Sequence, residues 1–183
     1  MDEVKITTTV GRFEKNGQEY LVRFFNPDSF FDLRDLREIV QSPGVQSWMS
    51  SVRNMSHKHY RKWMLENGEG NQFLWAISET KMDESDGRRV HGFIYFYPSE
   101  DFKGAIDVSY AKRPGAPAGL IAPALKESCK LVREKMGLVT TMVAEIERGN
   151  EASIVVIEKA GFIKTRGFDR QGNGIWTLDW TKV

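Results

Sequence analysis

The stretch between residues 104 and 136 combines the features of an anion-binding site. An expected strand at 104–112, GAIDVSYAK, leads through the Pro- and Gly-rich segment 113–119 into an expected helix from about Leu120 to Met136. Backbone N–H groups at a helix N-terminus have no intrahelical partner, and the helix dipole adds partial positive charge there. Lys112 and Arg113 would lie at the entrance to this turn. The alternative is an ordinary strand-to-helix connection that binds nothing.

A second stretch, ERGNEASIVVIEKAGF at 147–162, contains the signals of a short helix with both ends marked. Asn150 is a suitable N-cap, because its side-chain oxygen can accept an N–H of the first turn. Lys159 favours the negative end of the helix dipole, and Gly161 suits the left-handed position beyond the last turn. The spacing therefore predicts a helix at 151–160.

The elements around these stretches predict one α/β domain, 1–183, with a largely antiparallel sheet. Asn26-Pro27 is expected to begin a helix that ends at Pro43-Gly44, and a second helix is expected from about Val45 to Glu66. The strand–helix–strand unit 104–147 should be a parallel, right-handed crossover. The expected strands are 18–26, 72–80, 89–98, 104–112, 139–147, 162–170 and 174–183, the last two forming a hairpin around QGNG.

Composition excludes several classes of protein. The 183 residues carry a formal net charge of +1, which gives no overall attraction for nucleic acid or anionic lipid. The basic and aromatic segment 53–63 could contact RNA, but a solvated helix face is the simpler interpretation. Cys129 is the only cysteine, so there is no internal disulfide, and the three histidines do not have metal-ligand spacing. With no long apolar run, we expect no membrane span, no metal and a cytoplasmic location.

Three segments together resemble the second half of the GNAT N-acetyltransferases, most closely the RimJ/RimL branch. They are SYAKRPGAPAGLIAPALK, EKMGL and AEIERGNEASIVVIEKAGF. Ser109-Tyr110 and Pro114 match the end of the coenzyme-binding strand in that branch. The later helix motif of the branch is matched at Asn150, Ser153, Lys159, Gly161 and Phe162. The resemblance implies a GNAT-like fold, a mostly antiparallel twisted sheet flanked by helices.

The resemblance also implies which residues bind acetyl-CoA, the acyl donor. The core would be 104–165, and helices in 27–66 would form the acceptor side. The implied contacts are Ser109, Tyr110 and Ala111 on the strand, Arg113, Gly115, Ala118, Gly119 and Leu120 in the pyrophosphate-binding arm, and Asn150 and Ser153 on the later helix. This arm is degenerate with respect to the family pattern, which has Arg or Gln, then Gly, then Gly or Ala at three positions. A gapless alignment puts Pro117, Leu120 and Ala122 at these positions. An alignment that starts at Arg113 puts Ala116 and Ala118 at the second and third. In both alignments the middle glycine is missing.

For chemistry, the resemblance implies direct attack of a primary amine on the thioester. Glu145 is the first choice of general base and Asp107 the second, although either could be a carboxylate at a sheet edge or in an ion pair. Ile157 occupies the position at which many relatives have a tyrosine that acts as the general acid. Tyr110, Cys129 or water would then have to protonate the leaving thiolate. We therefore expect an N-acyltransferase, most simply an acetyltransferase acting on a protein N-terminus or a small molecule.

Two other functions remain open from the sequence. A GNAT-like module could have lost catalysis and bind coenzyme or a protein, and a weaker alternative is an RNA- or ribosome-associated domain. A homodimer is also left open.

Overall fold

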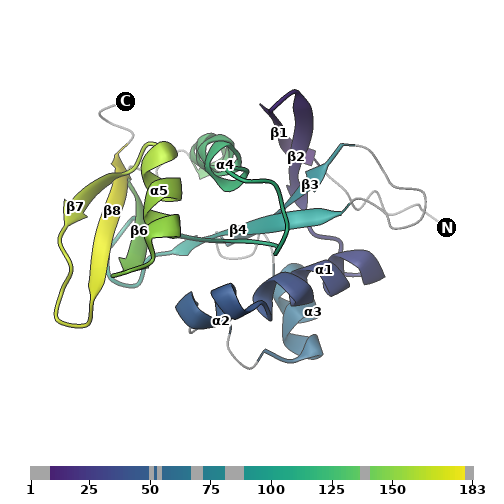
Figure 1. The fold of residues 1–183 in the computed structure, drawn as a ribbon, viewed down its shortest axis with the longest axis horizontal. Helices are drawn as coiled ribbons and strands as arrows, with labels where there is room; N and C mark the ends of the chain where they lie inside the picture. Colours follow the sequence, from purple (N-terminus) through teal and green to yellow (C-terminus); the bar gives the residue numbers. More distant parts are fainter. Residues whose placement is uncertain are drawn as a thin grey trace.

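The computed structural model describes residues 9–49, 52, 55–66, 72–80, 89–136 and 141–179. Within them an eight-stranded sheet has the order β1-β2-β3-β4-β5-β6-β8-β7, in which all neighbours are antiparallel except β5 and β6 (Figure 1). The strands are β1 Thr9–Lys15, β2 Gln18–Phe24, β3 Phe73–Glu79, β4 Val90–Pro98, β5 Ile106–Lys112, β6 Thr141–Glu147, β7 Ile163–Arg166 and β8 Asn173–Asp179. The helices are α1 Phe30–Val40, α2 Pro43–Trp48, α3 His57–Leu65, α4 Ile121–Met136 and α5 Glu151–Lys159. The predicted α+β class with a mixed, mostly antiparallel sheet is confirmed.

Helices cover both faces of the sheet, α4 and α5 on one and α1, α2 and α3 on the other (Figure 1). Alternate residues of a strand point to opposite faces. In β3, Trp75 and Ile77 accordingly pack in the core cluster with α4, whereas Leu74 and Ala76 pack with α1 and α3. None of the helices in the described ranges has the length and apolarity needed to cross a bilayer.

The strand β1 was not expected from the sequence. It forms a hairpin with β2, and the two residues between them, Asn16 and Gly17, have positive φ values of 53° and 74°. Asn-Gly is the preferred pair for such a tight turn, because both central residues must adopt left-handed conformations. The Asn16-Gly17 pair therefore indicates this hairpin, although the residues at the beginning of the chain are polar.

The helical region after β2 also differs from the prediction. Ser29, not Asn26, caps α1, and its hydroxyl accepts the N–H of Asp32. The Asn26 side chain instead accepts the N–H of Asp28 at 2.9 Å, which forms a local turn. The helix expected at 45–66 is two helices: Pro43 begins α2, and the N–H of Ser56 donates to His59 Nδ1 at the start of α3.

The other expected elements lie within two residues of the observed ones, apart from β7, which ends at Arg166 instead of 170. The expected ends at 139–140 and 180–183 lie outside the described residues. One face of α4 packs into the core, where Leu125, Cys129 and Val132 are completely buried.

The parallel pair at the centre of the sheet is short. β5 and β6 pair at Ile106–Met142 and Asp107–Val143 and at no further described position. On its other side β5 stays paired with β4 along its whole length, up to Lys112. Beyond Asp107, β5 therefore has one unpaired edge facing the gap between the two strands, where backbone groups are available to a ligand.

Candidate active site

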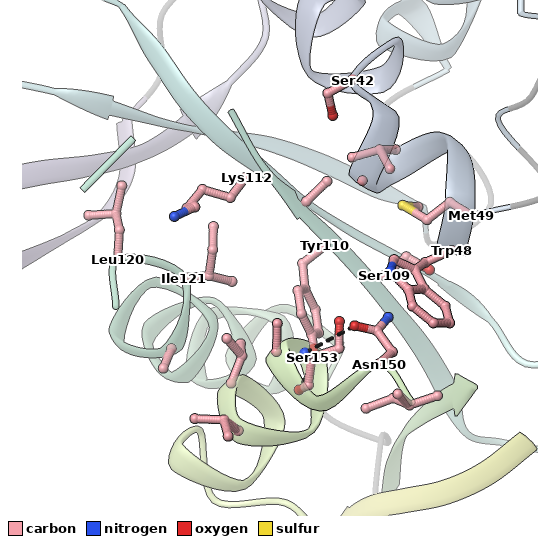
Figure 2. A pocket seen from close by; sticks show the side chains of 18 of the residues that line it. Ser42, Trp48, Met49, Ser109, Tyr110, Lys112, Leu120, Ile121, Asn150 and Ser153 are labelled. Carbon is pink, nitrogen blue, oxygen red and sulfur yellow. Dashed lines mark hydrogen bonds between the residues drawn. The ribbon is translucent and has the colours of Figure 1, made fainter. Parts of the chain in front are cut away.

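A cavity of about 800 Å³, here called the large cavity, opens where β5 and β6 separate (Figure 2). Its walls come from β5, the following arm, β6, the first turn of α4, α5 along its length, and α2. It collects nearly all the residues that the sequence placed in one site: Ser109, Tyr110, Ala111, Arg113, Gly115, Ala118, Gly119, Leu120, Glu145, Asn150 and Ser153. Asp107 does not line it. Trp48 of α2 also lines the cavity, and no sequence pattern pointed to it.

One wall is fixed by contacts between β5 and α5. The Tyr110 hydroxyl donates to the backbone carbonyl of Ser153 at 2.9 Å, and burial raises the pKa of this phenol. The Asn150 side-chain oxygen accepts the Ser153 N–H at 3.3 Å, so Asn150 is the predicted N-cap (Figure 2). The Tyr110 proton is engaged by a carbonyl, and a raised pKa makes the phenol a weaker acid. Both observations argue against Tyr110 as the general acid.

The arm bends at two glycines. Gly115 and Gly119 have φ values of 78° and 69°, in the left-handed region that only glycine adopts readily. Leu120 is completely buried in the core, so its side chain is not available to a ligand. Pro123 is the third residue of α4, where its missing N–H interrupts no helical bond but removes one donor from this end.

Two lysines lie at the arm. Lys112 Nζ donates to the carbonyl of Ala116 at 3.3 Å. Lys15, from the end of β1, is near Gly119, since a Cβ added at that glycine would lie 3.4 Å from Lys15 Nζ. Sequence reasoning missed Lys15 because the strand that carries it was not expected.

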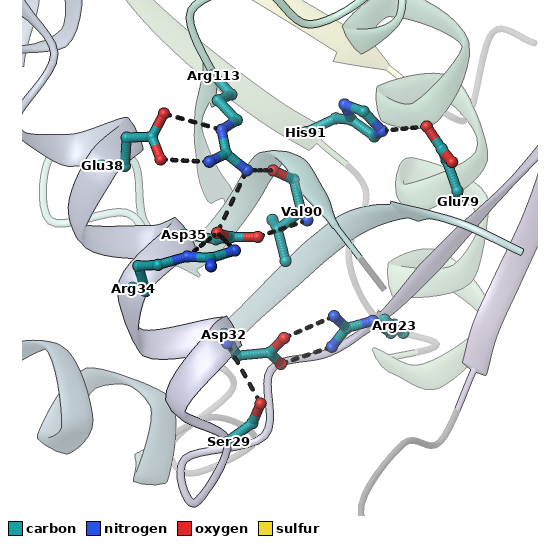
Figure 3. Close-up of polar contacts among 10 residues, drawn as sticks. All are labelled: Arg23, Ser29, Asp32, Arg34, Asp35, Glu38, Glu79, Val90, His91 and Arg113. Carbon is teal, nitrogen blue, oxygen red and sulfur yellow. Dashed lines mark hydrogen bonds and ion pairs between the residues drawn. The ribbon is translucent and has the colours of Figure 1, made fainter. Parts of the chain in front are cut away.

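Arg113 lines the large cavity, and its guanidinium is paired with α1. Its guanidinium forms a two-pronged ion pair with Glu38 of α1, with 3.0 Å between Nε and Oε1, and lies 3.3 Å from Asp35 (Figure 3). Its backbone N–H donates to His91 at 2.8 Å. The residue is 5% exposed. Arg113 therefore fixes the start of the arm against α1.

A second cavity of about 440 Å³, here called the small cavity, lies between α3 and the sheet. Its described lining is Met49, Val52, Met55, His59, Lys62, Trp63, Glu66, Tyr95, Tyr97 and Ser109. Met49 and Ser109 line both cavities, so the two meet there. Of the aromatic residues on this face of β4, Phe93 is completely buried, whereas Tyr95 and Tyr97 line the small cavity.

Two acidic groups, Asp107 and Glu145, lie near this meeting point, since the charge of each raises the pKa of Tyr97, whose hydroxyl is 3.4 Å from Ser109 Oγ. Burial raises the pKa of Glu145, and Asp101 and Asp169 raise it further. Burial also raises the pKa of Asp107, helped by Asp101 and Glu145 and opposed by a hydrogen bond from Ser99. A carboxyl group with a raised pKa is a stronger base once ionised, which suits proton abstraction.

The remaining candidates have simple outcomes. Cys129 is completely buried in the core and burial raises its pKa, so it cannot reach a reacting group. Ile157 is completely buried as well. His59 is exposed and lines the small cavity, and the side chain of His57 lies outside the described set. No group of three or more potential metal ligands occurs among the described residues.

Comparison with known proteins places these cavities in context. The family described as Acetyltransferase (GNAT) domain matches residues 21–163. No curated protein matches the chain. An acetyltransferase of the GNAT family from Bacillus anthracis has 15% identity and a TM-score of 0.68, over 87% of this chain and 94% of its own.

Two further structures show the same fold. The ribosomal-protein-S5-alanine acetyltransferase from Vibrio fischeri has 14% identity and a TM-score of 0.67, covering 92% of this chain and 96% of its own. The aminoglycoside acetyltransferase AAC(6')-Ib, in complex with coenzyme A and kanamycin, has 14% identity and a TM-score of 0.65, covering 88% and 95%.

Proposed function

The chain belongs to the GNAT family of acetyl-CoA-dependent acetyltransferases, and from this premise we propose that it acetylates a primary amine by direct attack where the two cavities meet. The observation that carries the proposal is that Ser109, on the unpaired edge of β5, lines both cavities. A donor in the large cavity and an amine in the small cavity would therefore have one place in common. We place the chain in the RimJ/RimL branch on its Asn150–Phe162 motif.

The residues of the large cavity fit coenzyme A. The unpaired edge of β5 at Ser109, Tyr110 and Ala111 offers strand-like hydrogen bonds to the pantetheine amides. The arm bends at Gly115 and Gly119 and leads to the N-terminus of α4, a suitable place for a diphosphate. The side chain of Asn150 lies in the same wall. When bound, acetyl-CoA supplies an activated acetyl carbonyl on a thiol leaving group.

The arm is degenerate, and we propose that lysines compensate for its lost donors. Pro114, Pro117 and Pro123 have no N–H, and Arg113 is committed to α1. Lys15, beside Gly119, and Lys112 place two positive charges at the arm. A hydrogen bond between charged groups contributes about 1.5–3 kcal/mol, enough to replace a backbone donor.

We propose Glu145 as the general base and Asp107 as the second choice. An alkylammonium has no lone pair, so a carboxylate near Ser109 must remove its proton first. Glu145 lines the large cavity, whereas Asp107 lines neither. Glu145 takes the first proton from the ammonium and releases it to solvent. In the transfer the amine nitrogen forms a bond to the acetyl carbon, the carbon–sulfur bond breaks, and the nitrogen loses its second proton through a water molecule that protonates the departing thiolate.

Two measurements on the purified protein test this function. Isothermal titration with acetyl-CoA should give a Kd between about 1 µM and 1 mM, the usual range for enzyme substrates. A thiol-release assay over a panel of primary amines should then show turnover. Absence of acetyl-CoA binding would refute the proposal. Binding without thiol release for any amine would favour the alternative, a coenzyme- or protein-binding module, which is motivated by the degenerate arm and by Ile157 at the position where many relatives have a tyrosine.

A further inference from the structure

Three aromatic rings form a continuous wall of the small cavity. The Trp63 ring of α3 stands edge-on to Tyr95, with 5.0 Å between centroids and 85° between planes. Tyr95 stacks on Tyr97 at 4.9 Å and 27°. Met49, Val52 and Met55 add further apolar atoms to the lining.

These rings are held in place by hydrogen bonds and by packing against a buried ring. Tyr95 and Tyr97 are two residues apart on β4 and so share one face of the sheet. The Tyr95 hydroxyl donates to Gln72 at 2.6 Å, and the Tyr97 hydroxyl lies 3.4 Å from Ser109 Oγ. Trp63 also packs on the buried Phe93 ring at 5.5 Å. The wall is therefore built before a ligand arrives, which lowers the entropy lost on binding.

The charges of the small cavity do not suit a polycation. Glu66 is the one carboxylate in its described lining, and Lys62 Nζ lies 3.3 Å from it. A ligand with several ammonium groups needs several carboxylates to replace the water it loses. At the Ser109 end, in contrast, the charges of Asp107 and Glu145 both raise the pKa of Tyr97, whose hydroxyl lies 3.4 Å from Ser109 Oγ, so negative charge is available there for a single ammonium group.

We propose that the small cavity selects a primary monoamine with an aromatic body, an arylalkylamine, as the acetyl acceptor. This inference rests on the proposed function. The aromatic body would pack against Trp63, Tyr95 and Tyr97, because aromatic pairs are favoured beyond their buried area. The amine would extend toward Ser109, where the cavities meet and the carboxylates lie. The cavity volume of about 440 Å³ is in the range of small-molecule sites.

Equilibrium binding to the full chain tests the acceptor class without relying on turnover. 2-Phenylethylamine should bind about tenfold more tightly than n-butylamine by isothermal titration, the ratio expected for about one favourable aromatic contact. It should also bind more tightly than spermidine. Equal affinity for 2-phenylethylamine and n-butylamine, or tighter binding of spermidine, would overturn the inference.

Variants of the aromatic wall test whether the preference for 2-phenylethylamine over n-butylamine arises in the small cavity. Trp63→Leu should reduce the preference for the aromatic amine to about twofold, and Tyr97→Leu provides a second variant should the first fail to fold. Phe102→Leu is the matched control, since Phe102 is 37% exposed and lines neither cavity. A tenfold preference that survives in both leucine variants would place the aromatic amine elsewhere and reject the proposal.

The two hypotheses can fail separately. If acetyl-CoA does not bind but 2-phenylethylamine still binds with its tenfold preference, the proposed function is wrong and the assignment of the small cavity stands. If thiol release is as fast with n-butylamine as with 2-phenylethylamine at equal low concentration, the acetyltransferase activity stands and the acceptor class is wrong.

Discussion

The hydroxyl of Tyr110 donates a 2.9 Å hydrogen bond to the carbonyl of Ser153, and so joins β5 to α5 across the gap in which β5 and β6 separate. Tyr110→Phe removes this bond and leaves the carbonyl without that donor. We expect the free energy of unfolding to fall by about 1 kcal/mol, measured by urea denaturation. Because the phenol proton is engaged and its pKa is raised by burial, kcat in the thiol-release assay should change less than threefold.

An acid role for Tyr110 would give a different result. Loss of a general acid lowers kcat by about a hundredfold or more. A decrease of that size in Tyr110→Phe, with the protein still folded at the assay temperature, would restore Tyr110 as the proton donor to the leaving thiolate.

Lys15 next to Gly119 leads to a prediction about coenzyme affinity. Lys15→Met keeps the aliphatic stem and removes the charge, and we expect the Kd for acetyl-CoA to rise about tenfold at low salt. The difference should shrink in 0.5 M NaCl, because salt screens the interaction of an accessible charge. Isothermal titration at the two salt concentrations measures both effects.

Lys130→Met is the matched control for Lys15→Met. Lys130 is on the exposed side of α4, 3.7 Å from Glu127, and lines neither cavity. The Kd of Lys130→Met for acetyl-CoA should stay within twofold of the wild-type value. If both variants weaken acetyl-CoA binding equally, Lys15 acts only through the net charge of the protein. The arm must then bind the diphosphate by its backbone alone.

Asp107 should reduce stability when it is ionised. Burial raises its pKa in the folded state, so folding favours the protonated form. The destabilisation is absent below the unfolded pKa of about 3.8, develops as the pH rises from there, and is complete above the raised folded-state pKa. Asp107→Asn should therefore melt at a higher temperature than the wild type at pH 7, and the Tm difference should decrease toward pH 3.

Thermal melts from pH 3 to pH 8 check this pattern. Glu134→Gln on the exposed face of α4 removes the same charge at a distance from the cavities, and corrects for the change in net charge. A Tm of Asp107→Asn below that of the wild type at pH 7 would mean that the ionised carboxylate is stabilising, for instance through its hydrogen bond with Ser99.

Sequence predicted the features of the site that depend on neighbouring residues. Asn150 caps α5, and Gly161, with φ of 102°, follows its C-terminal end, because caps and left-handed glycines are local requirements. The alternation of side chains along a strand likewise puts Ser109 and Tyr110 on opposite faces of β5. The resemblance to GNAT enzymes, and not any local pattern, predicted which residues gather around the large cavity.

Contacts between distant segments could not be predicted in this way. Arg113 pairs with Glu38, 75 positions earlier in the chain. A basic residue that the sequence placed at the entrance of an anion site therefore holds the arm against α1. The small cavity exists because α3 brings Trp63 against Tyr95 of β4, and no periodicity in either element encodes that pairing. Lys15 was missed for a different reason, since the Asn16-Gly17 turn signal that positions it was overlooked.

Glu145 gives the sharpest prediction about chemistry, since its ionisation should set the acidic limb of the pH profile. A general base must be ionised, so kcat/KM should rise with pH through its pKa, and burial places that pKa above the usual value of 4.5. Glu145→Gln should lower kcat about a hundredfold, remove this limb and leave the Kd for acetyl-CoA within twofold of the wild type. Glu147→Gln is the matched control, because Glu147 lines the same cavity two residues further along the same face of β6, and its kcat should change less than threefold. Wild-type turnover in Glu145→Gln would transfer the base role to Asp107, where the same pH profile on Asp107→Asn would decide it.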